Sequence, residues 1–285
     1  MYTLLIDVPQ LLALQASGAD VRVFDASFDL ARPQAADEAF AQVRIRGARQ
    51  AHLERDLSAH GDRPAVNGGR HPLPTRESVV AWLGTQGVGP ETQVVVYDRN
   101  QGMQCGRLWW MLQWVGHPAA AVLDGGLAAW QAAGGPTEQG PLAPVAAREL
   151  PLRPPLRELV LIEAVQAGLG DPAQVMVDAR AAPRYRGEVE PLDPVAGHIP
   201  GALNRPFGDN FEADGRYKSA AQLRAEWSAL LAGRPAAHVV HQCGSGVSAI
   251  PNLIAMEVAG LGPTRLYAGS WSEWCRTPGL PCARG

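Results

Sequence analysis

One loop of this 285-residue chain combines a nucleophile with a backbone that can bend around an anion. It begins at Cys243 and continues Gly244-Ser245-Gly246-Val247-Ser248, directly after the predicted strand 239–242. The two glycines allow the backbone to turn until several N–H groups point at one centre, and a helix predicted over 247–260 would add its positive N-terminal end. Such a field favours a bound anion and also the thiolate form of a cysteine. The sequence therefore predicts a reactive Cys243 in an anion-binding loop.

The other three cysteines, Cys105, Cys275 and Cys282, have no such setting. None of the four forms a Cys-x-x-Cys pair, and they do not combine with the seven histidines in zinc-ligand spacing. We therefore expect free thiols in a reducing compartment and no bound metal. A GxGxxG after the first strand and a GxxxxGK[ST] are both absent, so we expect no organic cofactor either.

An internal duplication indicates which elements position this loop. Four landmarks occur twice in the same order: 21–26 with 175–179, 45–48 with 199–202, 94–98 with 239–243, and 122–126 followed by Trp130 with 266–270 followed by Trp274. In this alignment Asp98 occupies the place of Cys243. The first copy therefore has the strand and the turn but no nucleophile at that place.

Strand patterns alternate with helical patterns in both copies, and the helical ones cover 76–86, 107–115, 222–231 and 247–260. This alternation predicts an α/β fold of two domains, each a mainly parallel sheet covered by helices on both faces. We expect an N-terminal domain over 1–140, a Pro-, Gly- and Ala-rich linker over 141–156, and a C-terminal catalytic domain over 157–285. Parallel sheets bind ligands at the carboxyl ends of their strands, which is where Cys243 falls.

Composition and charge exclude several classes of partner. The formal net charge is −3, so the chain has no basic field for nucleic acid or for an anionic membrane surface. No run of about 18 apolar residues is present, so we expect no membrane span. The N-terminus lacks a basic segment followed by an apolar stretch, which predicts a cytoplasmic protein. A small molecule or another protein is the expected partner.

Several motifs together resemble the tandem rhodanese-domain sulfurtransferases. They are the Cys243 loop, Asp178-Ala179-Arg180 with Arg184-Tyr185-Arg186-Gly187, Gly197-His198-Ile199-Pro200-Gly201-Ala202, and Leu123-Asp124-Gly125-Gly126 with Trp130. The match extends over nearly the whole chain. The loop is similar to that of the family's mercaptopyruvate members, which implies an N-terminal domain without a catalytic cysteine and a C-terminal one that forms a persulfide on Cys243.

The resemblance also implies substrates. The donor would be 3-mercaptopyruvate, which leaves as pyruvate, and the acceptor would be cyanide or a thiol, such as that of a thioredoxin-like protein. Arg184 matches the substrate-binding arginine of the family, and the mercaptopyruvate members carry a second arginine where this chain has Asp193. Arg186, Arg107 and Arg180 are candidates to compensate for its loss. The remaining residues expected to bind substrate belong to the loop: Gly244, Gly246, Val247 and Ser248.

The same resemblance implies a proton relay. In mercaptopyruvate members a loop serine acts with a histidine and an acid from the N-terminal domain. The matching residues are Ser245, His71 and Glu54, and Glu54 stands where the family usually has an aspartate.

Three alternatives stay open at this point. Thiosulfate sulfurtransferases are the nearest one, although their loops resemble Cys-Arg-Lys-Gly-Val-Thr, whose two cations suit a dianionic donor. A cysteine phosphatase would need a longer loop ending in arginine, and Ala249 stands there. A non-catalytic persulfide carrier or docking module would keep the fold without turnover, and the presence of both Cys243 and Arg184 argues against it.

Overall fold

The computed structural model describes residues 1–285, which form two compact units. The first unit consists of Met1–Ser58, Pro74–Leu156 and Phe211–Tyr217, and the second of Ala59–Leu73, Arg157–Asn210 and Lys218–Gly285. The segment that carries His71 therefore belongs to the same unit as Cys243. None of the helices combines the length and the apolar character needed to cross a membrane.

The first unit is built on a five-stranded parallel sheet. Its strands, in spatial order, are β1 (Leu5–Ile6), β6 (Ala120–Leu123), β5 (Gln93–Tyr97), β2 (Val21–Asp25) and β4 (Arg49–Gln50). The central strand β5 is buried along its whole length. A run of three valines suits that place, because a parallel sheet is covered on both faces and favours continuous apolar strands.

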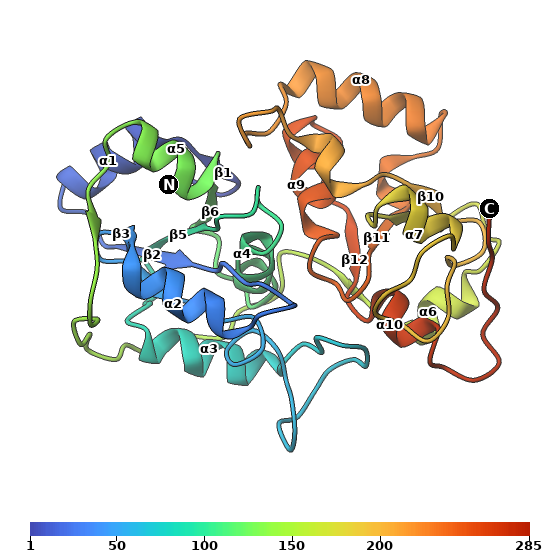
Figure 1. Ribbon diagram of the computed structural model, residues 1–285, viewed down its shortest axis with the longest axis horizontal. Helices are drawn as coiled ribbons and strands as arrows, with labels where there is room; N and C mark the ends of the chain where they lie inside the picture. The colour runs from blue at the N-terminus through green and yellow to red at the C-terminus, as the bar shows by residue number, and fades with distance from the viewer. The chain divides into compact units, whose positions relative to one another are not determined.

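Helices cover both faces of this sheet (Figure 1). On one face α1 (Val8–Ala16) and α5 (Gly126–Ala132) pack with Val23 and Val95 in one apolar core. On the opposite face α3 (Arg76–Thr85) places Trp82 against Phe24, with ring centroids 5.9 Å apart. Every residue of α4 (Cys105–Trp114) is buried. The unit also contains α2 (Gln34–Gln42) and a small antiparallel pair, β3 (Arg44–Ile45) with β7 (Thr137–Glu138).

The second unit repeats this sheet strand for strand. The order is β10 (Leu203–Asn204), β9 (Val175–Asp178), β11 (Val239–Gln242), β12 (Arg265–Tyr267) and β8 (Leu159–Val160), again all parallel. These strands correspond in position to β4, β2, β5, β6 and β1. The predicted α/β fold is thus confirmed, and Cys243 follows the central strand of its sheet, as Asp98 does in the first.

The two faces of the second sheet are covered by different helices (Figure 1). Trp271 and Trp274 of α10 (Ser270–Trp274) pack with Val240 and with α6 (Ile162–Ala167). His241 follows Val240 and therefore faces the other side, where it meets Trp227 edge-on. That side is covered by α8 (Ala220–Leu231) and α9 (Ile250–Val258). The remaining elements are α7 (Ala182–Arg186) and two short 3₁₀ turns, η1 (Phe207–Asn210) and η2 (Ala236–His238).

The helix after the catalytic loop begins later than the sequence predicts. The pattern predicts helix over 247–260, but α9 begins at Ile250 and residues 247–249 continue the loop as a turn. Ile250 donates its N–H to the carbonyl of Val247 across this turn. The periodicity of apolar residues does not reveal the difference, because Val247, Ala249 and Ile250 are buried in the turn as they would be in a helix.

Candidate functional site

The backbone around Cys243 is fixed by the start of α10. The N–H of Cys243 donates to Ser270 Oγ at 3.1 Å, and its carbonyl accepts from the N–H of Trp271 at 3.0 Å. The carbonyl of Gly244 accepts from the N–H of Ser272 at 2.9 Å. These bonds hold the first two loop residues, and the Cys243 side chain is only 1% exposed. The nucleophile predicted from the sequence therefore lies in a rigid and sheltered place.

Gly246 makes the bend of the loop possible. Its φ is +73°, a conformation that costs a residue with a side chain about 1–2 kcal/mol. A Cβ at this position would also lie 2.2 Å from the carbonyl oxygen of Ala268, which precedes α10 on the neighbouring strand end. Only glycine therefore allows the loop to pass this close to the β12–α10 connection.

Several N–H groups of the loop have no acceptor within the chain. They belong to Gly244, Ser245, Val247 and Ser248. In the first unit the equivalent N–H groups have a built-in acceptor, because the Asp98 carboxylate accepts four backbone N–H bonds at 2.8–2.9 Å, from Asn100, Gly102, Gln104 and Cys105. One copy of the loop therefore contains its own anion. The other copy has a cysteine and free donors, which is an arrangement suited to an anion from outside.

Cys105 does not replace the missing nucleophile of the first unit. Burial raises the pKa of its thiol well above the usual range, and the nearby Asp98 carboxylate raises it further. The side chain is 1% exposed and stays a protonated thiol. The surroundings of Cys105 in the sequence likewise give it no setting that would activate its thiol.

The structure brings Ser245 and His71 together. Ser245 Oγ and His71 Nδ1 are 2.8 Å apart, and both side chains are buried. The segment 59–73 that carries His71 is closed by two backbone bonds, from Ala59 to Pro72 and from Val66 to Leu73. Glu54 lies in the first unit, half-buried, and its assignment to the relay stays a prediction.

Arg184 projects from α7 toward the loop, but one edge of its guanidinium is already occupied. Its Nη2 donates to both carboxylate oxygens of Glu190, at 2.7 and 2.9 Å, and its Nε donates to one of them at 3.3 Å. Its Nη1 faces the loop, 3.6 Å from the position that a Cβ of Gly244 would take. Burial by itself raises the pKa of Glu190, but the bonds from Arg184 and from the backbone N–H groups of Leu192 and Asp193 outweigh it, so the pKa is lowered.

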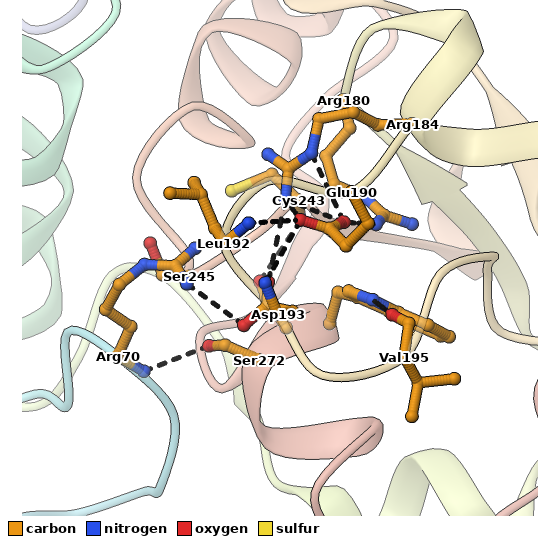
Figure 2. A network of polar contacts seen from close by, with 12 residues as sticks. Arg70, Arg180, Arg184, Glu190, Leu192, Asp193, Val195, Cys243, Ser245 and Ser272 are labelled. Carbon is orange, nitrogen blue, oxygen red and sulfur yellow. Dashed lines mark hydrogen bonds and ion pairs between the residues drawn. The ribbon is translucent and has the colours of Figure 1, made fainter. Parts of the chain in front are cut away.

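Arg180 supplies a buried positive charge near the nucleophile (Figure 2). Its guanidinium binds the Asp178 carboxylate through Nε and Nη2 and also donates to the carbonyl of Gly197. Burial lowers its pKa, but the charges of Asp178, Glu190 and Cys243 raise it more, and the net shift is upward. Arg180 is therefore held as a cation between the Asp178 and Glu190 carboxylates, in the neighbourhood of Cys243.

The two other arginines predicted to bind the substrate have partners within their own units. Arg186 is 43% exposed and forms an ion pair with Glu188 at 2.7 Å. Arg107 is fully buried in the first unit, where its Nη2 donates to the carbonyl of Leu57 at 3.2 Å. These contacts give no indication that Arg186 or Arg107 binds the sulfur donor.

Arg70 is not among the residues predicted from the sequence, but in the structure it pairs with Asp193. The Asp193 side chain is 0% exposed, and its Oδ1 accepts from Arg70 Nη1 at 3.0 Å and forms an ion pair with Arg276 Nη1 at 3.0 Å. Its Oδ2 lies 3.5 Å from Arg184 Nη2. Asp193 stands where the family has an arginine, and its carboxylate pairs with three arginines: Arg70, Arg184 and Arg276. The only sequence signal was that Arg70 directly precedes His71, since 123 residues separate it from Asp193.

Comparisons with known proteins agree with this geometry. The family model "Rhodanese-like domain" matches residues 8–133 and again 161–277. A probable 3-mercaptopyruvate sulfurtransferase of Pseudomonas aeruginosa is 45% identical over 97% of this chain and 96% of its own. The thiosulfate sulfurtransferase of Gallus gallus is 30% identical over 90% of this chain and 87% of its own. Among solved structures, a 3-mercaptopyruvate sulfurtransferase from Leishmania major is similar with a TM-score of 0.83 and 28% identity, over 98% of this chain and 76% of that one.

Proposed function

Because this chain belongs to the rhodanese-like sulfurtransferases, with the family's domain present twice, we propose that it moves sulfur from 3-mercaptopyruvate to a thiol or cyanide through a persulfide on Cys243. The single observation that supports this best is the difference between the two loops. One contains the Asp98 carboxylate, whereas the other offers free N–H donors around a cysteine.

The first half-reaction forms the persulfide. The Cys243 thiolate attacks the sulfur of 3-mercaptopyruvate, an S–S bond forms, and the C–S bond of the donor breaks. Its electron pair goes to the methylene carbon as the enolate of pyruvate, which then takes a proton at that carbon. Loop N–H groups and the charge of Arg180 stabilise the anionic sulfur, as preorganised donors do at developing charges.

The second half-reaction releases the sulfur. An acceptor thiolate attacks the outer sulfur of the persulfide, which gives an acceptor persulfide and returns the Cys243 thiolate. The two half-reactions share one site, so ping-pong kinetics are expected. We propose a thioredoxin-like thiol as the physiological acceptor and a cytoplasmic setting, where the four cysteines stay reduced.

Ser245 and His71 are the proposed source of the proton for the enolate. Their 2.8 Å contact lets His71 deliver a proton through the serine hydroxyl, and burial of both groups keeps competing water away. Glu54 is the proposed third member on the strength of the family pattern alone.

A thiosulfate donor is the second candidate, because the guanidinium groups of Arg70 and Arg184 both lie beside Gly244 of the loop and could face a dianionic donor. The test compares kcat/KM for 3-mercaptopyruvate and for thiosulfate with the same acceptor, using wild-type and Cys243→Ser proteins. We expect at least a tenfold preference for mercaptopyruvate, about 1.4 kcal/mol in transition-state binding, and no turnover by the variant. A preference for thiosulfate would overturn the donor assignment. A wild-type protein that forms the persulfide but never turns over would instead be a carrier.

A further inference from the structure

The Asp193 carboxylate is buried, and its two oxygens are used unequally. Oδ1 accepts a hydrogen bond from Arg70 Nη1 at 3.0 Å, whereas Oδ2 accepts none and lies 3.5 Å from Arg184 Nη2. One acceptor oxygen is enough to hold Arg70, and the amide of an asparagine would supply it as well. What only a carboxylate supplies at this place is its negative charge.

This charge lies close to the loop that receives the sulfur donor. The groups nearest to a Cβ at Gly244 are Arg70 Nη2, at 3.2 Å, and two nitrogens of Arg184, at 3.6 and 3.8 Å. Asp193 pairs with both side chains, so a single guanidinium separates its carboxylate from Gly244 (Figure 2). The Asp193 side chain is 0% exposed, and buried charges act on their neighbours more strongly than charges in water do.

Asp193 also determines the charge balance of a larger network. Ion pairs of 2.6–3.5 Å join four guanidinium groups to three carboxylates: Arg70, Arg180, Arg184 and Arg276 to Asp178, Glu190 and Asp193. One positive charge is therefore left over, and a neutral residue at position 193 would leave two. At neutral pH 3-mercaptopyruvate carries one negative charge, because its thiol is mostly protonated, whereas thiosulfate carries two. The present network suits the donor with one charge.

We propose that Asp193 is a specificity-determining residue that selects the sulfur donor by charge and favours a monoanion, such as a 2-oxo acid, over a dianion. Its carboxylate acts through the field that it adds beside Arg70 and Arg184, without touching the donor. This inference rests on the proposed function and names the charge class of its donor.

The experiment uses two donors that differ by one charge and react in the same way. They are thiosulfate, a dianion, and methanethiosulfonate, a monoanion. In both, the Cys243 thiolate attacks the outer sulfur, a new S–S bond forms, and the S–S bond of the donor breaks. The electron pair of that bond leaves with sulfite or with methanesulfinate. The rate of persulfide formation on Cys243 is measured by mass without an acceptor, and the ratio of the two rates then reports the effect of charge.

We expect Asp193→Asn to raise the ratio of the thiosulfate rate to the methanethiosulfonate rate about tenfold, because the dianion is relieved of twice the repulsion. Asp193→Glu keeps the charge and should keep the wild-type ratio. Glu190→Gln removes another charge of the network and should raise the ratio too, so the test does not depend on one variant folding. If Asp193→Asn lowered both rates by the same factor, Asp193 would only be an anchor for Arg70 and the proposal would be overturned.

Glu188→Gln is a matched control, because it removes a carboxylate of the same segment that lies outside the network. Glu188 is 53% exposed and pairs with Arg186 at 2.7 Å. Its ratio should stay within twofold of wild type, and a shift as large as that of Asp193→Asn would mean that overall charge, not Asp193, selects the donor. Wild-type protein that takes sulfur from both test donors but not from 3-mercaptopyruvate would refute the proposed donor, while the ratio would still decide the role of Asp193.

Discussion

Replacing Gly246 by alanine tests whether the shape of the loop determines activity. A Cβ at Gly246 would lie 2.2 Å from the Ala268 carbonyl oxygen, whereas ordinary contact begins at 3.4 Å, so one of the two must move by about 1 Å. Ala268 lies two residues before Ser270, whose hydroxyl accepts the N–H of Cys243. A displacement of about 1 Å at a reacting group can cost about 100-fold in rate. We therefore expect kcat/KM to fall about 100-fold.

Gly201 provides a matched control in the same unit. Its φ is +80°, close to that of Gly246, but a Cβ there meets nothing within 4 Å. Gly201→Ala should lose about 1–2 kcal/mol of stability from backbone strain and keep its activity within twofold. Urea unfolding and sulfur transfer are measured on both variants. If Gly246→Ala were as active as Gly201→Ala, the argument that the loop must approach the β12–α10 connection would be wrong.

Two further predictions concern buried groups near the loop. Burial lowers the pKa of His241 to about 3 in the folded protein, whereas the same side chain has a pKa near 6.5 in the unfolded chain. The contribution of His241 to the free energy of unfolding is therefore fully present above about pH 6.5 and is lost as the pH falls toward 3. The loss between pH 7 and pH 5 is about 2 kcal/mol. Urea unfolding should show this slope, and His241→Leu should remove that part of it; an equal slope in the variant would contradict the assignment. Ser245→Ala should lower kcat with 3-mercaptopyruvate about 100-fold, since it breaks the proton path to the enolate, and should leave sulfur transfer from polysulfide nearly unchanged. Equal losses with both donors would mean that the serine shapes the loop rather than delivering a proton.

Local sequence patterns were sufficient to predict that the chain forms two α/β domains with parallel sheets. Asp25 and Asp178 end strands that pair with the central strand of each sheet, and Asp98 and Cys243 follow those central strands. The duplication therefore predicted both sheets, because a parallel sheet brings strand ends together at one edge. The predicted start of α9 was three residues too early, because Val247 and Ala249 are as buried in the turn as they would be in a helix.

The donor-binding side of the site could be predicted only in part. Cys243 and Ser245 are local features of one loop, and His71 came from a resemblance. The contact between Arg70 and Asp193 joins residues 123 positions apart, with no periodicity to indicate it. Asp193 was interpreted as the loss of a cation, whereas in the structure it holds a cation from another segment. Long-range ion pairs of this kind depend on tertiary packing, which spacing along the chain does not encode.

The most direct test of the proposed persulfide mechanism is the mass of the Cys243 peptide after brief exposure of the protein to 3-mercaptopyruvate without an acceptor. We expect a gain of one sulfur atom on Cys243 alone, release of one equivalent of pyruvate, and loss of that sulfur when a thiol is added. No added sulfur at Cys243, or added sulfur at Cys105, Cys275 or Cys282 instead, would contradict it.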